Sequence, residues 1–130
     1  VATEFEQEDI STTLAKCQRY CQDLTPPTGG DTAYIGDGYA ASTTVVIAFI
    51  NFIAEFRATP TVTLTGTPGD YSTYESNAAR AVTSIAINGP STNGTGINFT
   101  CSGGGLTVGE GAGVYLNADN THRSIIEAEL

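Results

Sequence analysis

The sequence predicts a mainly β protein: an antiparallel β-sandwich of the jelly-roll kind, preceded by one N-terminal α-helix. From residue 28 onward Gly, Thr, Ser and Asn dominate, and β-branched runs recur between turn signals. Several of these runs alternate apolar and polar residues, as at 61–65 and 97–101, which indicates strands with one buried and one solvated face. Many short strands with almost no helix between them favour a sandwich.

The chain divides into three parts. Residues 1–10 carry four acidic side chains and are expected to form an extended arm that links to an upstream module. Residues 11–24 are expected to form the helix, because Ser11 is a favourable N-cap and the proline pair at 26–27 cannot continue a helix. Residues 28–130 are then the sandwich domain.

Eight strands are expected within that domain. They are placed at residues 33–41, 43–51, 52–56, 61–66, 81–88, 96–101, 114–118 and 124–130. The polar, glycine-rich stretches 66–77, 88–96 and 102–113 are expected to be its loops.

The charge balance excludes two classes of partner. The 130 residues include 14 Asp and Glu but only 5 Lys and Arg, which gives a net charge of −9. Nucleic acid and anionic membrane surfaces both require a basic surface, and five scattered cations cannot supply one. Membrane insertion is not expected, because the longest apolar run, residues 45–50, is far too short to span a bilayer.

The predicted helix carries a regular apolar stripe. Its members recur at alternating spacings of four and three residues, the heptad seam of a helix that packs on another helix or on a flat apolar surface: Ile10, Leu14, Cys17, Cys21 and Leu24. Both cysteines are expected to be buried there as small hydrophobic side chains. The stripe can be covered by further copies of the chain or by the chain's own sheet.

No catalytic or metal-binding pattern stands out, so neither an enzyme nor a cofactor is expected. The single histidine, His122, has no G-x-S-x-G nucleophile elbow to serve, and the many carboxylates do not form a recognisable pair. A zinc site from Cys17, Cys21, Cys101 and His122 would lack the usual ligand spacing.

The candidate binding residues lie in the stretch GDYSTYESN, residues 69–77. Tyrosine offers an apolar face and a hydroxyl group at low entropic cost, which suits carbohydrate recognition. The stretch places two tyrosines beside acidic and amide groups: Tyr71, Tyr74, Asp70, Glu75 and Asn77. The alternative is that one of the tyrosines packs back on the core.

Three segments carry a resemblance to a known family: VATEFE…LAKCQRYC, FIAEFRATPTVTL and the closing SIIEAEL. They resemble, in turn, the VATPFE…LALCQRYY segment, the FPVPMRATPTVT segment and the ADAEL-type terminus of the C-terminal "CQRYY"-type domain in tail-fibre and receptor-binding proteins of tailed bacteriophages. The segments lie at the start, middle and end of the chain. Cys21 stands where the family has its second tyrosine, and Glu55-Phe56 replaces Pro-Met.

The resemblance implies a non-enzymatic virion protein, assembled in the cytoplasm of the bacterial host and located in the phage tail. It implies a homotrimer that contacts other virion tail proteins and a bacterial surface glycan or protein. It also leaves open a domain associated with polysaccharide depolymerisation, and a purely structural module for trimerisation and capping.

Overall fold

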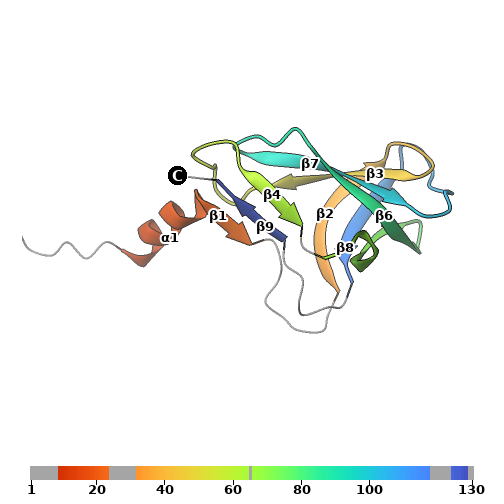
Figure 1. Ribbon diagram of the computed structural model, residues 1–130, viewed down its shortest axis with the longest axis horizontal. Coiled ribbons are helices and arrows are strands. Elements are labelled where there is room, and N and C mark those ends of the chain that lie inside the picture. The colour runs from red at the N-terminus through yellow and green to blue at the C-terminus, as the bar shows by residue number, and fades with distance from the viewer. Residues whose placement is uncertain (1–8, 24–31, 65, 118–123, 129–130) are drawn as a thin grey trace, which may run out of the picture.

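The computed structural model describes residues 9–23, 32–64, 66–117 and 124–128 (Figure 1). This part of the chain contains one α-helix, α1 (Ile10–Gln18), and a short 3-10 helix, η1 (Pro68–Asp70). Its strands are β1 (Cys21–Asp23), β2 (Ala33–Ala40), β3 (Val45–Asn51), β4 (Thr61–Leu64), β5 (Tyr71–Glu75), β6 (Ala78–Asn88), β7 (Gly94–Cys101), β8 (Gly111–Leu116) and β9 (Ser124–Glu127).

Six of the strands close into an antiparallel barrel in the order β2-β3-β7-β6-β5-β8, and β8 completes the ring by pairing with β2. The interior is filled by inward-facing side chains, as expected of a small barrel. The largest of them are fully or almost fully buried and include Val46, Tyr71, Ile97, Phe99 and Leu116.

A separate three-stranded antiparallel sheet, in the order β1-β9-β4, lies between α1 and the barrel (Figure 1). Its own small core consists of Phe56, Ile126 and Ala128. Phe52 and Val62 pack against both this core and the core of the barrel, so the two units share a continuous apolar contact.

The predicted mainly β, antiparallel protein with one helix near its start is confirmed, whereas the jelly-roll sandwich is not. The strands form a closed barrel and a small sheet in place of two facing sheets. The expected strand at 52–56 is wrong. Its backbone instead bonds to the turn before β7, with the N–H of Phe52 donating to the carbonyl of Asn93 and that of Phe56 to Thr92.

The predicted loop at 66–77 is also wrong in part, because it contains η1 and β5. The turn that joins β5 to β6 consists of Ser76 and Asn77, which have positive φ angles of 46° and 66°. Positive φ at both central residues is the geometry of a tight hairpin turn, and Asn tolerates it better than most residues.

Helix α1 is shorter than predicted, since it ends at Gln18 and the chain enters β1 at Cys21. The carbonyls of Arg19 and Tyr20 accept hydrogen bonds from the N–H groups of Arg57 and Ala128, which draws this segment into tertiary pairing. Tertiary contacts of this kind override helical propensity. Within the described residues, no helix is long and apolar enough to span a membrane.

Candidate functional site

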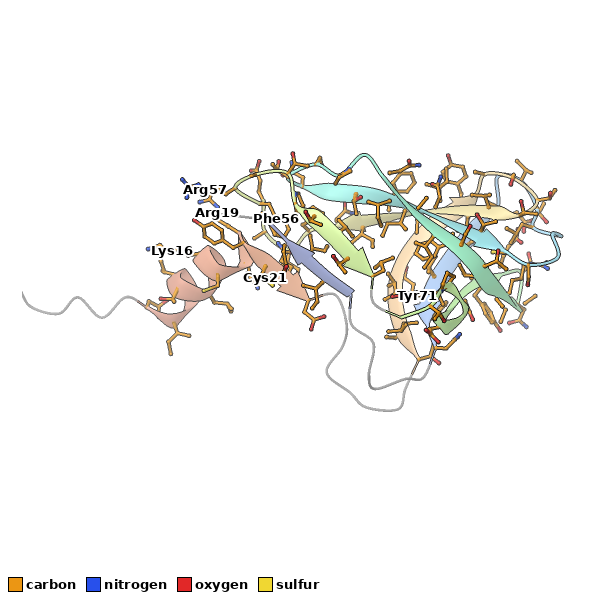
Figure 2. The ribbon with its side chains drawn as sticks, viewed as in Figure 1. Lys16, Arg19, Cys21, Phe56, Arg57 and Tyr71 are labelled. Carbon is orange, nitrogen blue, oxygen red and sulfur yellow. The ribbon has the colours of Figure 1, made fainter. Side chains whose placement is uncertain are left out.

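The candidate site develops from Tyr74, which lies on the outer surface of the barrel. Strand β5 alternates with period two, so that Tyr71, Thr73 and Glu75 face inward. Tyr74 faces outward and is 41% exposed, whereas Tyr71 (labelled in Figure 2) is fully buried in the core.

Two further tyrosines extend the surface from Tyr74: Tyr115 of the neighbouring strand contacts Tyr74, and Tyr34 contacts Tyr115. The register places Tyr115 of β8 opposite both Tyr34 of β2 and Ser72 of β5. The ring centroids of Tyr34 and Tyr115 are 5.3 Å apart at 65°, and those of Tyr74 and Tyr115 are 6.2 Å apart at 77°. These are favourable edge-to-face arrangements. We refer to Tyr34, Tyr74 and Tyr115 as the tyrosine cluster.

A hollow of about 370 Å³ lies beside the tyrosine cluster. It is lined by Thr32, Ser72, Tyr74, Ala79, Tyr115 and Asn117. The Ser72 hydroxyl donates to Oδ1 of Asn117 over 2.8 Å, and Nδ2 of Asn117 donates to the Gly69 carbonyl over 3.3 Å. These bonds hold the polar side of the hollow in one orientation.

A carboxylate adjoins the other end of the cluster. The pKa of Tyr34 is raised above its ordinary value, first by partial burial and then by a hydrogen bond to Asp37. The negative charge of Asp37 and the neighbouring Tyr115 raise it further. Tyr34 therefore remains a neutral hydrogen-bond donor over a wide pH range.

Three of the five cations of the chain, Lys16, Arg19 and Arg57, lie at the helix end of the molecule (Figure 2).

The structure brings together only part of the predicted binding stretch. Tyr74 and Asn77 lie together, with the Tyr74 hydroxyl donating to Oδ1 of Asn77 over 3.4 Å. Tyr71 had been expected in an exposed loop, but the strand that contains it turns its ring into the barrel, next to Phe99.

The two acidic members of the stretch have structural partners. Glu75 is buried and accepts a hydrogen bond from the N–H of Thr107 over 2.8 Å. Asp70 accepts from the N–H and the hydroxyl of Thr67 and so closes the first turn of η1.

Sequence reasoning missed Tyr34 and Tyr115, which lie about forty residues from Tyr74 in either direction. Only the outward phase of β2 and β8, together with their pairing, places Tyr115 beside Tyr74 and Tyr34 beside Tyr115. The outward direction of each ring follows from alternation along its strand, but the sequence does not show which strands pair with each other.

The apolar stripe of the helix is not buried among the residues that the structure describes. Ile10 is 84% exposed and Leu14 is 54% exposed, and α1 contains no buried residue. Cys21 lies in β1 and not on the helix, because the chain leaves the helix before this position. Leu24 lies outside the described residues.

Cys17 and Cys21 are exposed in the single chain, so the expected burial of these two cysteines is not provided by the chain's own sheet. Their exposure has the same cause as the exposure of the stripe: no element of the described chain covers this side of α1. Cys101 is buried, and its sulfur lies 3.0 Å from the hydroxyl oxygen of Thr73.

No group of three or more His, Cys, Asp or Glu side chains in the described residues is arranged to hold a metal ion. His122 lies outside this part of the chain. No known protein family, curated protein or solved structure matches the sequence or the fold of this chain.

Proposed function

We propose that this chain is a non-enzymatic receptor-binding domain of a phage tail fibre, which contacts a bacterial surface glycan through the tyrosine cluster. The observation that carries the proposal is the cluster itself. Tyr34 and Tyr74 are 44% and 41% exposed, and they present apolar ring surface beside fixed hydroxyl and amide groups. Aromatic rings with a polar edge are enriched at recognition surfaces for this reason.

The viral assignment is supported by the three segments that resemble tail-fibre domains. The first of them includes α1, whose apolar residues have no partner within the described chain. Three copies that pack these helices together would bury Ile10, Leu14 and Cys17 and would give the fibre its axis. Virion location and contacts with other tail proteins are parts of the same proposal.

The test uses the purified domain and a panel of bacterial lipopolysaccharides and capsular polysaccharides. We expect saturable binding to at least one of them, without release of shorter products. Tyr74→Ala should weaken binding about fivefold, because one aromatic contact contributes about 1 kcal/mol. Val108→Ala, which truncates an exposed apolar side chain in a loop, should leave binding unchanged.

Two outcomes would contradict the proposal. Release of oligosaccharide products would favour a depolymerase-associated domain. Absence of binding across the panel would leave the structural role in trimerisation and capping.

A further inference from the structure

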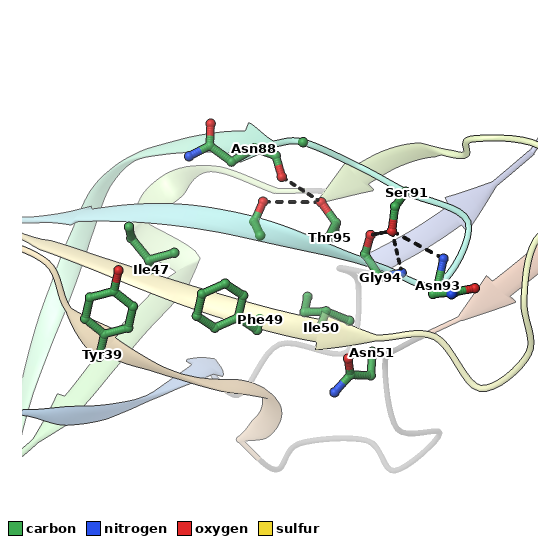
Figure 3. Close-up of a pocket in the computed structure, with 12 residues that line it drawn as sticks. Tyr39, Ile47, Phe49, Ile50, Asn51, Asn88, Ser91, Asn93, Gly94 and Thr95 are labelled. Carbon is green, nitrogen blue, oxygen red and sulfur yellow. Dashed lines mark hydrogen bonds between the residues drawn. The ribbon is translucent and has the colours of Figure 1, made fainter.

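A second hollow, larger than the first, lies on the outer face of β3, β7 and β6 (Figure 3). Two outward positions of β7 are glycines, Gly94 and Gly96, so this strand has no side chains there. The register places Gly96 between Phe49 on one side and Asn88 on the other. The result is a glycine-floored groove of about 670 Å³, a volume typical of ligand sites.

One wall of the glycine-floored groove is aromatic. Phe49 is 54% exposed and Tyr39 is 41% exposed, although each contributes a large apolar ring. The two rings stack with their centroids 6.2 Å apart and their planes 22° apart. They therefore form one continuous flat surface, and Figure 3 shows both rings along the groove.

The opposite wall carries amide groups. Nδ2 of Asn88 donates to Oδ1 of Asn98 over 3.0 Å, which fixes the orientation of the Asn88 carboxamide. Asn51, which follows Phe49 on β3, and Asn93, in the turn before β7, also line the groove. Both oxygen acceptors and N–H donors are thus available on short side chains.

The turn at the end of the groove is held by its own hydrogen bonds. The Ser91 hydroxyl oxygen accepts from the N–H groups of Asn93 and Gly94 over 3.3 and 3.2 Å. The same hydroxyl donates to the Gly94 carbonyl over 2.9 Å. A polar group on a fixed turn binds with a smaller loss of conformational entropy.

None of the residues that line the groove carries a charge. In a chain with a net charge of −9 and no cation at this position, an anionic ligand would be repelled. A cationic ligand would find no carboxylate among the lining residues. The lining therefore matches a neutral molecule that has an apolar face and many hydroxyl groups.

We propose that the glycine-floored groove binds an uncharged saccharide, whose C–H face lies on Phe49 and Tyr39 and whose hydroxyl groups bond to the amides of Asn51 and Asn88. The groove is separate from the tyrosine cluster. At Gly113 of β8 the ring of Tyr115 lies within 3.1 Å of the position that a Cβ would take, whereas at Gly96 the nearest atom to that position is the Asn88 carbonyl oxygen at 3.5 Å. The proposal does not depend on the viral assignment.

The experiment uses ligand-observed NMR on the full chain with maltotriose, cellotriose and mannotriose as neutral probes and trigalacturonate as the acidic probe. We expect at least one neutral trisaccharide to bind at millimolar concentration and trigalacturonate not to bind. Phe49→Ala should weaken that binding about fivefold through loss of one aromatic contact.

Gly96→Val provides a second test that adds atoms in place of removing them. A Cβ at Gly96 would lie 3.5 Å from the Asn88 carbonyl oxygen and 4.0 Å from the Phe49 ring, which are ordinary contacts. The valine should fit the strand and block the groove, so binding should be lost while the circular dichroism spectrum is retained. Gly94 is unsuitable, because its Cβ would lie 2.7 Å from the Ile50 carbonyl oxygen.

Val108→Ala, which truncates an exposed apolar side chain outside both hollows, serves as the control and should leave trisaccharide binding unchanged. The inference is overturned if no neutral trisaccharide binds, if trigalacturonate alone binds, or if folded Phe49→Ala and Gly96→Val bind as the wild type does.

Discussion

The ring of Tyr115 lies on Gly113, and a Cβ added to that glycine would be 3.1 Å from Cε2 and 3.4 Å from the hydroxyl oxygen of the tyrosine. Gly113 is paired with Asp37 on one side and with Tyr74 on the other. The absence of a side chain at this position therefore allows Tyr115 to lie between the other two members of the tyrosine cluster.

Gly113→Ala should displace the ring of Tyr115 and weaken glycan binding at the cluster. The stability of the domain should change by no more than about 1 kcal/mol, because the displaced atoms are the end of a partly exposed side chain. Binding to the polysaccharide panel and urea unfolding measure the two effects. Gly111→Ala, on the same strand with open space around its Cβ, is the control. Equal binding by both variants would show that the position of Tyr115 is irrelevant to recognition.

The contact of Tyr34 with Asp37 predicts a pH dependence. The pKa of Tyr34 is raised in the folded protein above the ordinary value of 10.0, so the folded state holds this proton more tightly than the unfolded state does. The contribution to stability is complete below pH 10 and is lost as the pH rises through the folded-state pKa. Urea unfolding of wild type and Tyr34→Phe should therefore show a steeper alkaline loss of stability in the wild type.

Asp37→Asn gives an independent check on the same contact. It removes the negative charge and weakens the hydrogen bond, so spectrophotometric titration should show Tyr34 ionising at a lower pH. Identical alkaline titrations of wild type and Asp37→Asn would contradict this account.

Gln22 is predicted to fasten the small sheet to the segment that follows β3. Its Oε1 accepts from the N–H of Ile53 over 2.8 Å, and its Nε2 donates to the carbonyls of Ala54 and Gln18 over 2.7 and 2.9 Å. Gln22→Ala would remove three hydrogen bonds to part-buried backbone groups and should cost about 1–3 kcal/mol in the free energy of unfolding. Gln18→Ala, which keeps the backbone carbonyl, should cost much less. Similar urea midpoints for the two variants would count against the assigned role of Gln22.

The three thiols should differ in reactivity. Cys21 is exposed and should be alkylated by iodoacetamide in the native protein, whereas buried Cys101 should react only after unfolding. Cys17 is exposed in the single chain and should be protected in the native protein where further copies cover α1. Partial burial and the charges of Glu127 and Asp23 raise the pKa of Cys21, which lowers its thiolate fraction and its rate of alkylation. Mass spectrometry of digested protein would measure each rate, and Glu127→Gln should accelerate the alkylation of Cys21. Labelling of Cys101 at the rate of Cys21 would refute the buried position.

The sequence predicted apolar and alternating strands well and the pairing-dependent strand β1 poorly. Strand β7 was located to within two residues because its apolar and polar residues alternate, and β3 to within two residues because it is a continuous apolar run. Strand β1 was hidden within a continuous helical pattern, since only its pairing with β9 makes Cys21–Asp23 extended. Closure of the barrel depends on the pairing of β8 with β2, which no local pattern encodes.

The candidate site was predictable to a similar extent. Tyr74 could be selected from its local setting, but Tyr34 and Tyr115 join it only through strand register. The inward position of Tyr71 follows from the alternation of Tyr71, Thr73 and Glu75, which was concealed by polar and acidic residues at inward positions. The glycine-floored groove depends equally on register, because Gly96 lies between Phe49 of β3 and Asn88 of β6.

Leu14→Asp tests whether α1 joins copies of the chain. A helix of nine residues is too short to be stable alone in water, yet α1 buries none of its side chains within the described chain. If three copies bury the stripe, an uncompensated carboxylate at Leu14 would have to enter an apolar interface at a cost of several kcal/mol. We expect analytical ultracentrifugation to give three times 13.5 kDa for the wild type and 13.5 kDa for the variant.

Ala15→Asp is the matched control for that experiment, because it adds the same charge to the adjacent exposed residue, which lies off the stripe. The control should remain trimeric and should retain the barrel, as Leu14→Asp should also do by circular dichroism. A monomeric wild type would exclude the helix as an interface between copies. A trimer that tolerates Leu14→Asp would place the contacts between copies on the β-strands and leave the exposed stripe available for another protein.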